Sequence, residues 1–195
     1  MSDAAALNRR AAVKSLMAAC PDALVIAGLG SSAYDLFAAG DRDLNFYLWG
    51  AMGGAASMGL GLALAQPKKS VLVLTGDGEQ LMGLGSLATI GAQQPNNLTV
   101  VVLDNGHYGE TGMQASHTAL GASLTAVATA CGLGWTMDIA KMAALQTLAE
   151  RIKAKQACGL ARVRVSADEL PRALPNRDAV FLKNRFRSAL GLSTT

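Results

Sequence analysis

The chain is poor in aromatic residues and in charge. Of its 195 residues, 5% are aromatic and 16% are charged, whereas 51% are hydrophobic. The low charge and the high apolar content exclude an intrinsically disordered chain. With few aromatics and 21 glycines, the composition favours closely packed α/β layers with many turns over a β-sandwich.

Cysteine is also scarce. Cys20, Cys131 and Cys158 are odd in number, lie far apart and form no CxxC motif. Without a secretion signal, this pattern predicts a reducing cytoplasm and no disulfide framework. A zinc site is not expected, because only His107 and His117 could add to the cysteine ligands.

Long hydrophobic runs and basic stripes are absent. The most apolar stretch, 51–65, is shorter than the roughly 20 residues that a membrane span needs. The net charge is only +3, and the positive excess gathers near the end, with a basic segment at about 171–195. No basic stripe with interleaved aromatics precedes residue 140, so neither a membrane nor a nucleic acid is expected as a partner.

The length predicts one domain over 1–195. Apolar runs that alternate with helical patterns predict a parallel sheet with helices on both faces. The expected strands are 23–27, 70–75, 98–103, 135–139 and 160–165. The expected helices are 8–19, one opened by the Ser31-Ser32 N-cap, 53–65, 80–93, 123–131 and 140–155.

Chemistry is expected at the carboxyl ends of these strands. The strand 70–75 runs into Gly76-Asp77-Gly78, where the glycines allow a sharp turn and close approach to a ligand. The next strand, 98–103, runs into Asp104-Asn105-Gly106-His107. Adjacent parallel strands should bring Asn105 near Asp77. A carboxylate, an amide oxygen and a main-chain carbonyl would suit Mg²⁺ that bridges to a phosphate.

A GDG triplet followed about 25–30 residues later by Asn resembles the signature of thiamine diphosphate (ThDP) enzymes, in their pyrophosphate-binding domain. The resemblance implies that Asp77, Asn105 and the main-chain oxygen of His107 hold Mg²⁺. It also implies a set of cofactor-binding residues: Ser31, Ser32, Gly50, Met52, Gly76, Asp77, Gly78, Glu79, Asn105, His107, Tyr108 and Gly109.

Some of these residues carry specific implied roles. In the segment Trp49-Gly50-Ala51-Met52-Gly53, the carbonyl of Gly50 would accept from the aminopyrimidine, and Met52 would enforce the bent shape of the cofactor. Glu79 stands where Ser is common and should point away from the diphosphate. His107 is a candidate proton donor.

Three further segments, 45–47, 104–112 and 183–186, resemble the branch that contains sulfopyruvate and phosphonopyruvate decarboxylases. The resemblance implies a lyase that releases CO₂ and an aldehyde from a small anionic 2-oxo acid. A second, pyrimidine-binding domain with its activating glutamate does not fit into 195 residues. We therefore expect a separate pyrimidine-binding subunit and a cytoplasmic hetero-oligomer such as α2β2 or larger.

Other functions stay open. An acetolactate-synthase-like carboligase or an oxidoreductase subunit would share these motifs, and a non-catalytic regulatory subunit would keep the fold. A dinucleotide-binding fold is disfavoured, because the turn at 28–30 lacks the third glycine of GxGxxG. The basic segment 183–187 is interpreted as a solvated helix, with docking on a partner or attraction of an anionic substrate as the alternatives. Ser57, Gly59 and Gly61 are expected to pack against the equivalent helix of a partner chain.

Overall fold

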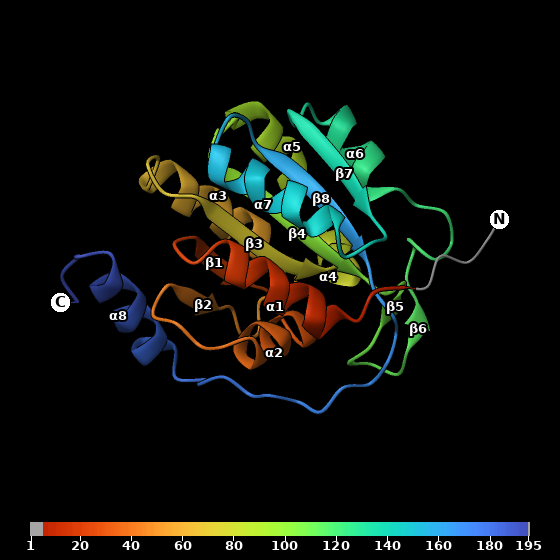
Figure 1. The fold of residues 1–195 in the computed structure, drawn as a ribbon, viewed down its shortest axis with the longest axis horizontal. Coiled ribbons are helices and arrows are strands. Elements are labelled where there is room, and N and C mark those ends of the chain that lie inside the picture. The colour runs from red at the N-terminus through yellow and green to blue at the C-terminus, as the bar shows by residue number, and fades with distance from the viewer. Residues whose placement is uncertain (1–5, 195) are drawn as a thin grey trace.

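A computed structural model describes residues 6–194, which form a six-stranded, wholly parallel sheet (Figure 1). The strand order is β2-β1-β3-β4-β8-β7. The strands are β1 (Leu24–Ala27), β2 (Asn45–Tyr47), β3 (Val71–Gly76), β4 (Leu98–Asp104), β7 (Trp135–Ile139) and β8 (Gly159–Arg164). A separate antiparallel pair joins β5 (His107–Tyr108) to β6 (Gln114–Ala115).

Helices cover both faces of the sheet, which confirms the predicted fold class (Figure 1). One face carries α1 (Arg9–Ala19), α2 (Ser31–Ala38) and α7 (Ala144–Ala154). The other carries α3 (Ala55–Ala65), α5 (Gly85–Gln93) and α6 (Leu124–Ala130). Beside the outer strand β2, α8 (Ala179–Ala189) contributes Leu182 to the first core and Phe186 to the second. The short α4 (Asp77–Met82) follows β3. Alternate residues of one strand serve the two cores: Val25 packs with the first group and Ile26 with the second.

The structure corrects several sequence predictions. The expected helix 80–93 is two helices, because Gly83 lies against Gly53, and a Cβ on Gly83 would overlap with the Gly53 carbonyl. The helix expected from 140 begins at Ala144. Gly30, with φ of 69°, occupies the N-cap of α2 in place of the serines that follow it. The strand β2 and the β5–β6 pair were not predicted.

The basic C-terminal segment forms a helix, α8, but this helix is not solvated all round. Leu182 and Phe186 are buried, and the Phe186 ring packs edge-on against Phe46 of β2. Arg185 is anchored by Asp41, whose Oδ2 lies 2.6 Å from its Nη1. The solvated-helix interpretation is therefore wrong for this inner side of α8.

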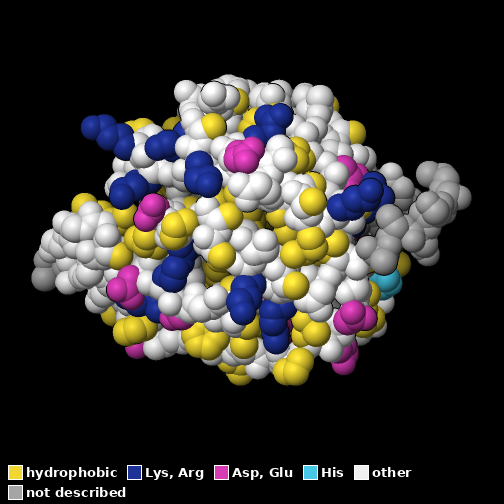
Figure 2. Space-filling model, viewed as in Figure 1, with side chains coloured by type: hydrophobic (Ala, Val, Ile, Leu, Met, Phe, Trp, Pro, Cys, Tyr) yellow, Lys and Arg dark blue, Asp and Glu magenta, His cyan; other side chains and the backbone are white. Residues whose placement is uncertain are grey.

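The outer surface is of mixed character. On the face shown in Figure 2, Lys and Arg side chains are interspersed with Asp, Glu and apolar side chains. No helix within residues 6–194 is long and apolar enough to cross a membrane.

Two glycines of α3 have different surroundings. Gly59 is buried against β3, where a Cβ would overlap with the Val73 side chain. Its close approach is therefore to its own sheet, and the expected contact of Gly59 with a partner helix is wrong. Gly61 faces outward, and nothing lies within 4 Å of a Cβ placed there.

These surroundings predict opposite effects of two matched substitutions. Gly59→Ala and Gly61→Ala both gain about 1 kcal/mol of helix propensity. Only Gly59→Ala overpacks the core, which costs about 1–3 kcal/mol. Urea unfolding should therefore find Gly61→Ala the more stable variant by about 1–3 kcal/mol. Equal unfolding midpoints would contradict the packing of α3 on β3.

Candidate functional site

The turn after β3 places Asp77 at the first position of α4, with 2% of its surface exposed. Its Oδ2 accepts a hydrogen bond from the Ser116 hydroxyl and one of 3.1 Å from the Thr118 hydroxyl. Burial raises the pKa of Asp77, the hydroxyl of Ser116 lowers it, and the nearby charge of Asp104 raises it again. Sequence reasoning missed Ser116 and Thr118, since nothing in their spacing marks them as partners of Asp77.

The end of β4 is joined to this network. The Thr118 hydroxyl also lies 2.8 Å from Asp104 Oδ1, so its single proton is shared between the two carboxylates. Arg162 on β8 donates from Nε to Asp104 Oδ2 at 2.5 Å. Asn105 turns its side-chain oxygen to the amide of His107, at 2.9 Å. The Nδ1 atom of His107 lies 2.8 Å from the Asn105 carbonyl oxygen. The two strand ends are thus linked through Thr118, and the residue of β4 that takes part in this link is Asp104 and not Asn105.

Gly78 allows an aromatic ring to lie against the start of α4. A Cβ on Gly78 would lie 2.5 Å from the Tyr108 ring. The Tyr108 hydroxyl in turn lies 3.5 Å from Nδ1 of His117. The missing side chain of Gly78 therefore determines where Tyr108 can pack.

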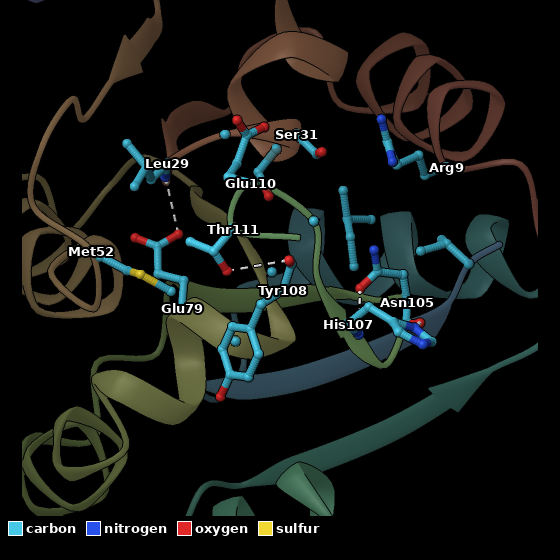
Figure 3. Close-up of a pocket in the computed structure, with 17 residues that line it drawn as sticks. Arg9, Leu29, Ser31, Met52, Glu79, Asn105, His107, Tyr108, Glu110 and Thr111 are labelled. Carbon is cyan, nitrogen blue, oxygen red and sulfur yellow. Dashed lines mark hydrogen bonds between the residues drawn. The ribbon is translucent and has the colours of Figure 1, made fainter. Parts of the chain in front are cut away.

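Glu79 reaches across to the loop after β1. Its Oε2 accepts from the Leu29 amide at 3.1 Å and from the Thr75 hydroxyl at 2.9 Å (Figure 3). A Cβ on Gly28 would overlap with this carboxylate. The other oxygen, Oε1, is buried without a hydrogen-bond partner among residues 6–194, and burial raises the pKa of Glu79.

These strand ends surround one pocket, which contains most of the predicted site (Figure 3). Ten of the twelve predicted cofactor-binding residues line it: Ser31, Ser32, Met52, Gly76, Gly78, Glu79, Asn105, His107, Tyr108 and Gly109. The other two, Gly50 and Asp77, are not part of its lining. The side chain of Asp77 is hydrogen-bonded to Ser116 and Thr118 instead.

The pocket also has lining residues outside the predicted set of twelve. They are Arg9, Leu29, Gly30, Leu103, Glu110, Thr111 and Val165. Glu110 and Thr111 belong to the loop between β5 and β6, next to predicted residues. Arg9 lies on α1, far away along the chain, and no spacing or motif connects it with the strand ends.

Comparison with known proteins assigns the chain to a family. Residues 29–177 match the family model of the thiamine pyrophosphate enzyme, C-terminal TPP binding domain. The chain is 49% identical over 130 residues to phosphonopyruvate decarboxylase of Streptomyces viridochromogenes, covering 66% of this chain and 32% of that protein. It is 46% identical over 110 residues to sulfopyruvate decarboxylase subunit beta of Methanocaldococcus jannaschii, covering 56% of this chain and 58% of that subunit.

The chain thus spans about a third of the first relative and somewhat over half of the second. Its fold is similar to that of benzoylformate decarboxylase from Polynucleobacter necessarius, with a TM-score of 0.69 at 20% identity. That likeness covers 88% of this chain and 36% of the solved one. The resemblance stated from the sequence is confirmed: the chain belongs to the thiamine pyrophosphate enzymes, and it carries their C-terminal TPP-binding domain.

Proposed function

We propose that this chain is the ThDP- and Mg²⁺-binding subunit of a two-chain decarboxylase for a small 2-oxo acid with an anionic tail, of the sulfopyruvate or phosphonopyruvate type. The observation that carries the proposal is the convergence of three strand ends, β1, β3 and β4, on one pocket in a chain of this family. The names of the relatives support the substrate class. The free cysteines Cys20, Cys131 and Cys158 support a reducing, cytoplasmic setting.

The residues present fit a diphosphate held through a divalent cation. The helix α2 begins without a side-chain cap, so the amides of Ser31 and Ser32 are free to bind an anion. Asp77 and Asn105 offer hard oxygen donors, as Mg²⁺ prefers. A cation beside Asp77 would offset the cost of burying its carboxylate near Asp104.

Under this proposal, Asp77, Asn105 and the His107 carbonyl hold Mg²⁺. The amides near Ser31 and Gly78 bind the diphosphate, while Gly76, Tyr108 and Gly109 complete the wall of the pocket. Met52 supports the bent cofactor, and the Gly50 carbonyl accepts from its aminopyrimidine. Glu79 fixes the loop at Leu29 and so stays turned away from the diphosphate.

When bound, ThDP supplies the electron sink for loss of CO₂ from the substrate. This chain orients the cofactor, and His107 is placed in the pocket wall where it could donate a proton. The activating glutamate comes from a pyrimidine-binding partner subunit.

Exposed apolar side chains near the pocket support such a partner. Met52 in the pocket wall is 37% exposed, and Met82, which lies against Gly53, is 65% exposed. Exposed apolar side chains beside a pocket are typical of surfaces that another chain covers.

Native mass spectrometry of the complex from its own host tests the proposal. We expect a partner with a pyrimidine-binding domain, together with ThDP and Mg²⁺, and CO₂ release from sulfopyruvate or phosphonopyruvate by the complex. A homo-oligomer without cofactor would count against the two-chain enzyme and favour a regulatory subunit.

The cation site predicts that Asp77→Asn abolishes cofactor binding. Bound ligand at 100 times its Kd stabilises a folded protein by about 2.7 kcal/mol. Thermal unfolding of the wild type should therefore shift upward with ThDP and Mg²⁺, and that of Asp77→Asn should not. Asp43→Asn, at a side chain 74% exposed, is the matched control and should respond like the wild type. A normal shift in Asp77→Asn would refute the metal assignment.

The contact between Gly28 and Glu79 predicts a coupled pair. Gly28→Ala should destabilise the fold by about 1–3 kcal/mol, because the new methyl group meets the Glu79 carboxylate. In the double variant with Glu79→Ala, this cost should largely disappear, giving a coupling of about 0.5–3 kcal/mol in a double-mutant cycle. Strictly additive effects on unfolding would show that the contact is not made.

A further inference from the structure

Arg9 lies where the cofactor pocket continues into a second, polar hollow. It lines both cavities, as do Ser31, Asn105, Gly109 and Glu110. Among the described residues that line the cofactor pocket, Arg9 is the one Lys or Arg. Arg9 is therefore the Lys or Arg side chain placed to contact an anion in this pocket.

The Arg9 side chain is fixed in place and largely buried, at 7% exposure. Its Nε donates to Asp35 Oδ2 at 2.6 Å, and its Nη1 donates to the Asp168 carbonyl at 3.2 Å. Its other terminal nitrogen, Nη2, has no hydrogen-bond partner within the described part of the chain. One arm of a rigid guanidinium is thus left for a ligand.

The charge of Arg9 is not fully neutralised by its partner. Asp35 is completely buried and also accepts from Arg10 Nε, at 3.1 Å. Two guanidinium groups therefore share one carboxylate, and the group of three carries a net positive charge. Because a buried excess charge is costly, an anion beside Arg9 would be stabilised there more than in water.

Neither carboxylate that lines the pocket is paired with Arg9. Glu110 is paired with Arg172 at 3.1 Å, and Glu79 is bonded to the Leu29 amide and to Thr75. Figure 3 shows Arg9 across the pocket from Met52 and Glu79. The pocket thus has a cationic end, near Arg9 and the start of α2, and an anionic end near Glu79.

We propose that Arg9 binds an oxyanion of the cofactor's diphosphate and sets which way round the cofactor lies in the pocket. The inference rests on the proposed function, since it takes the pocket to be the ThDP site. It adds a binding residue from α1, outside the strand-end motifs. The phosphonate or sulfonate tail of a substrate has the same chemistry, so the test must separate these two sources.

Arg10 provides a matched control. It binds the same Asp35 carboxylate, but its Nη2 donates to the Pro171 carbonyl, and it does not line the pocket. Arg9→Gln and Arg10→Gln therefore each remove one cation from Asp35, and only Arg9→Gln removes one from the pocket. Arg9→Lys keeps the charge beside Asp35 and loses the second arm, so it serves if Arg9→Gln does not fold.

The experiment uses the assembled enzyme, stripped of cofactor, at constant Mg²⁺. Calorimetry measures the affinities for ThDP and for inorganic pyrophosphate, and steady-state kinetics measures the substrate KM at saturating ThDP. We expect Arg9→Gln to weaken both ligands by about 10–100-fold, as for a lost charge-assisted hydrogen bond. Arg9→Lys should weaken them less, and Arg10→Gln should bind both within about twofold of the wild type.

The following outcomes would contradict the inference, the proposed function or both. Wild-type affinity for pyrophosphate in Arg9→Gln, or in Arg9→Lys if only that variant folds, would overturn the inference. If Arg9→Gln raises the substrate KM and leaves the ThDP affinity unchanged, Arg9 binds the substrate tail, and the inference is overturned. If the wild type binds ThDP but does not decarboxylate, and Arg9→Gln weakens that binding, the proposed function is refuted and the inference stands. Wild-type enzyme that binds neither ligand would overturn both.

Discussion

The burial of the Asp77 carboxylate is the constraint on which the loops of the site depend. A carboxylate that is 2% exposed must be hydrogen-bonded, and the hydroxyls of Ser116 and Thr118 meet this need. To supply them, the chain must leave β4, form the β5–β6 pair and return over the end of β3. Thr118 then reaches Asp104 as well, and Arg162 ties Asp104 to β8. One network therefore fixes three neighbouring strand ends.

Much of the fold and of the site could be predicted, because strong local signals coincide with it. The buried strands are continuous apolar runs, and the glycine-flanked Asp77 and the turn at Asn105 follow two of them directly. These signals need only a few adjacent residues. Together with the resemblance to the thiamine diphosphate enzymes, they identified ten residues that the fold brings to one pocket.

The missed features depend on contacts between distant parts of the chain. β2 has only three residues, and it is set by pairing with β1 and by the bond of Arg42 to Asn45. The break before α5 arises because Gly83 packs on Gly53, 30 positions earlier. Arg9 reaches the pocket only because α1 packs on α2, where it meets Asp35. No periodicity within one segment carries this information.

The packing of α8 on β2 has a consequence for synthesis. β2 is an outer strand of the sheet, and the Asn45 carbonyl, left over by its pairing with β1, accepts from Arg185 at 2.8 Å. An outer strand with free peptide groups invites pairing with other chains. Because α8 follows every strand in the chain, this protection comes last as the polypeptide leaves the ribosome. Until residues 179–189 have emerged, a nascent sheet would expose that edge, so aggregation during translation should depend on how soon α8 docks.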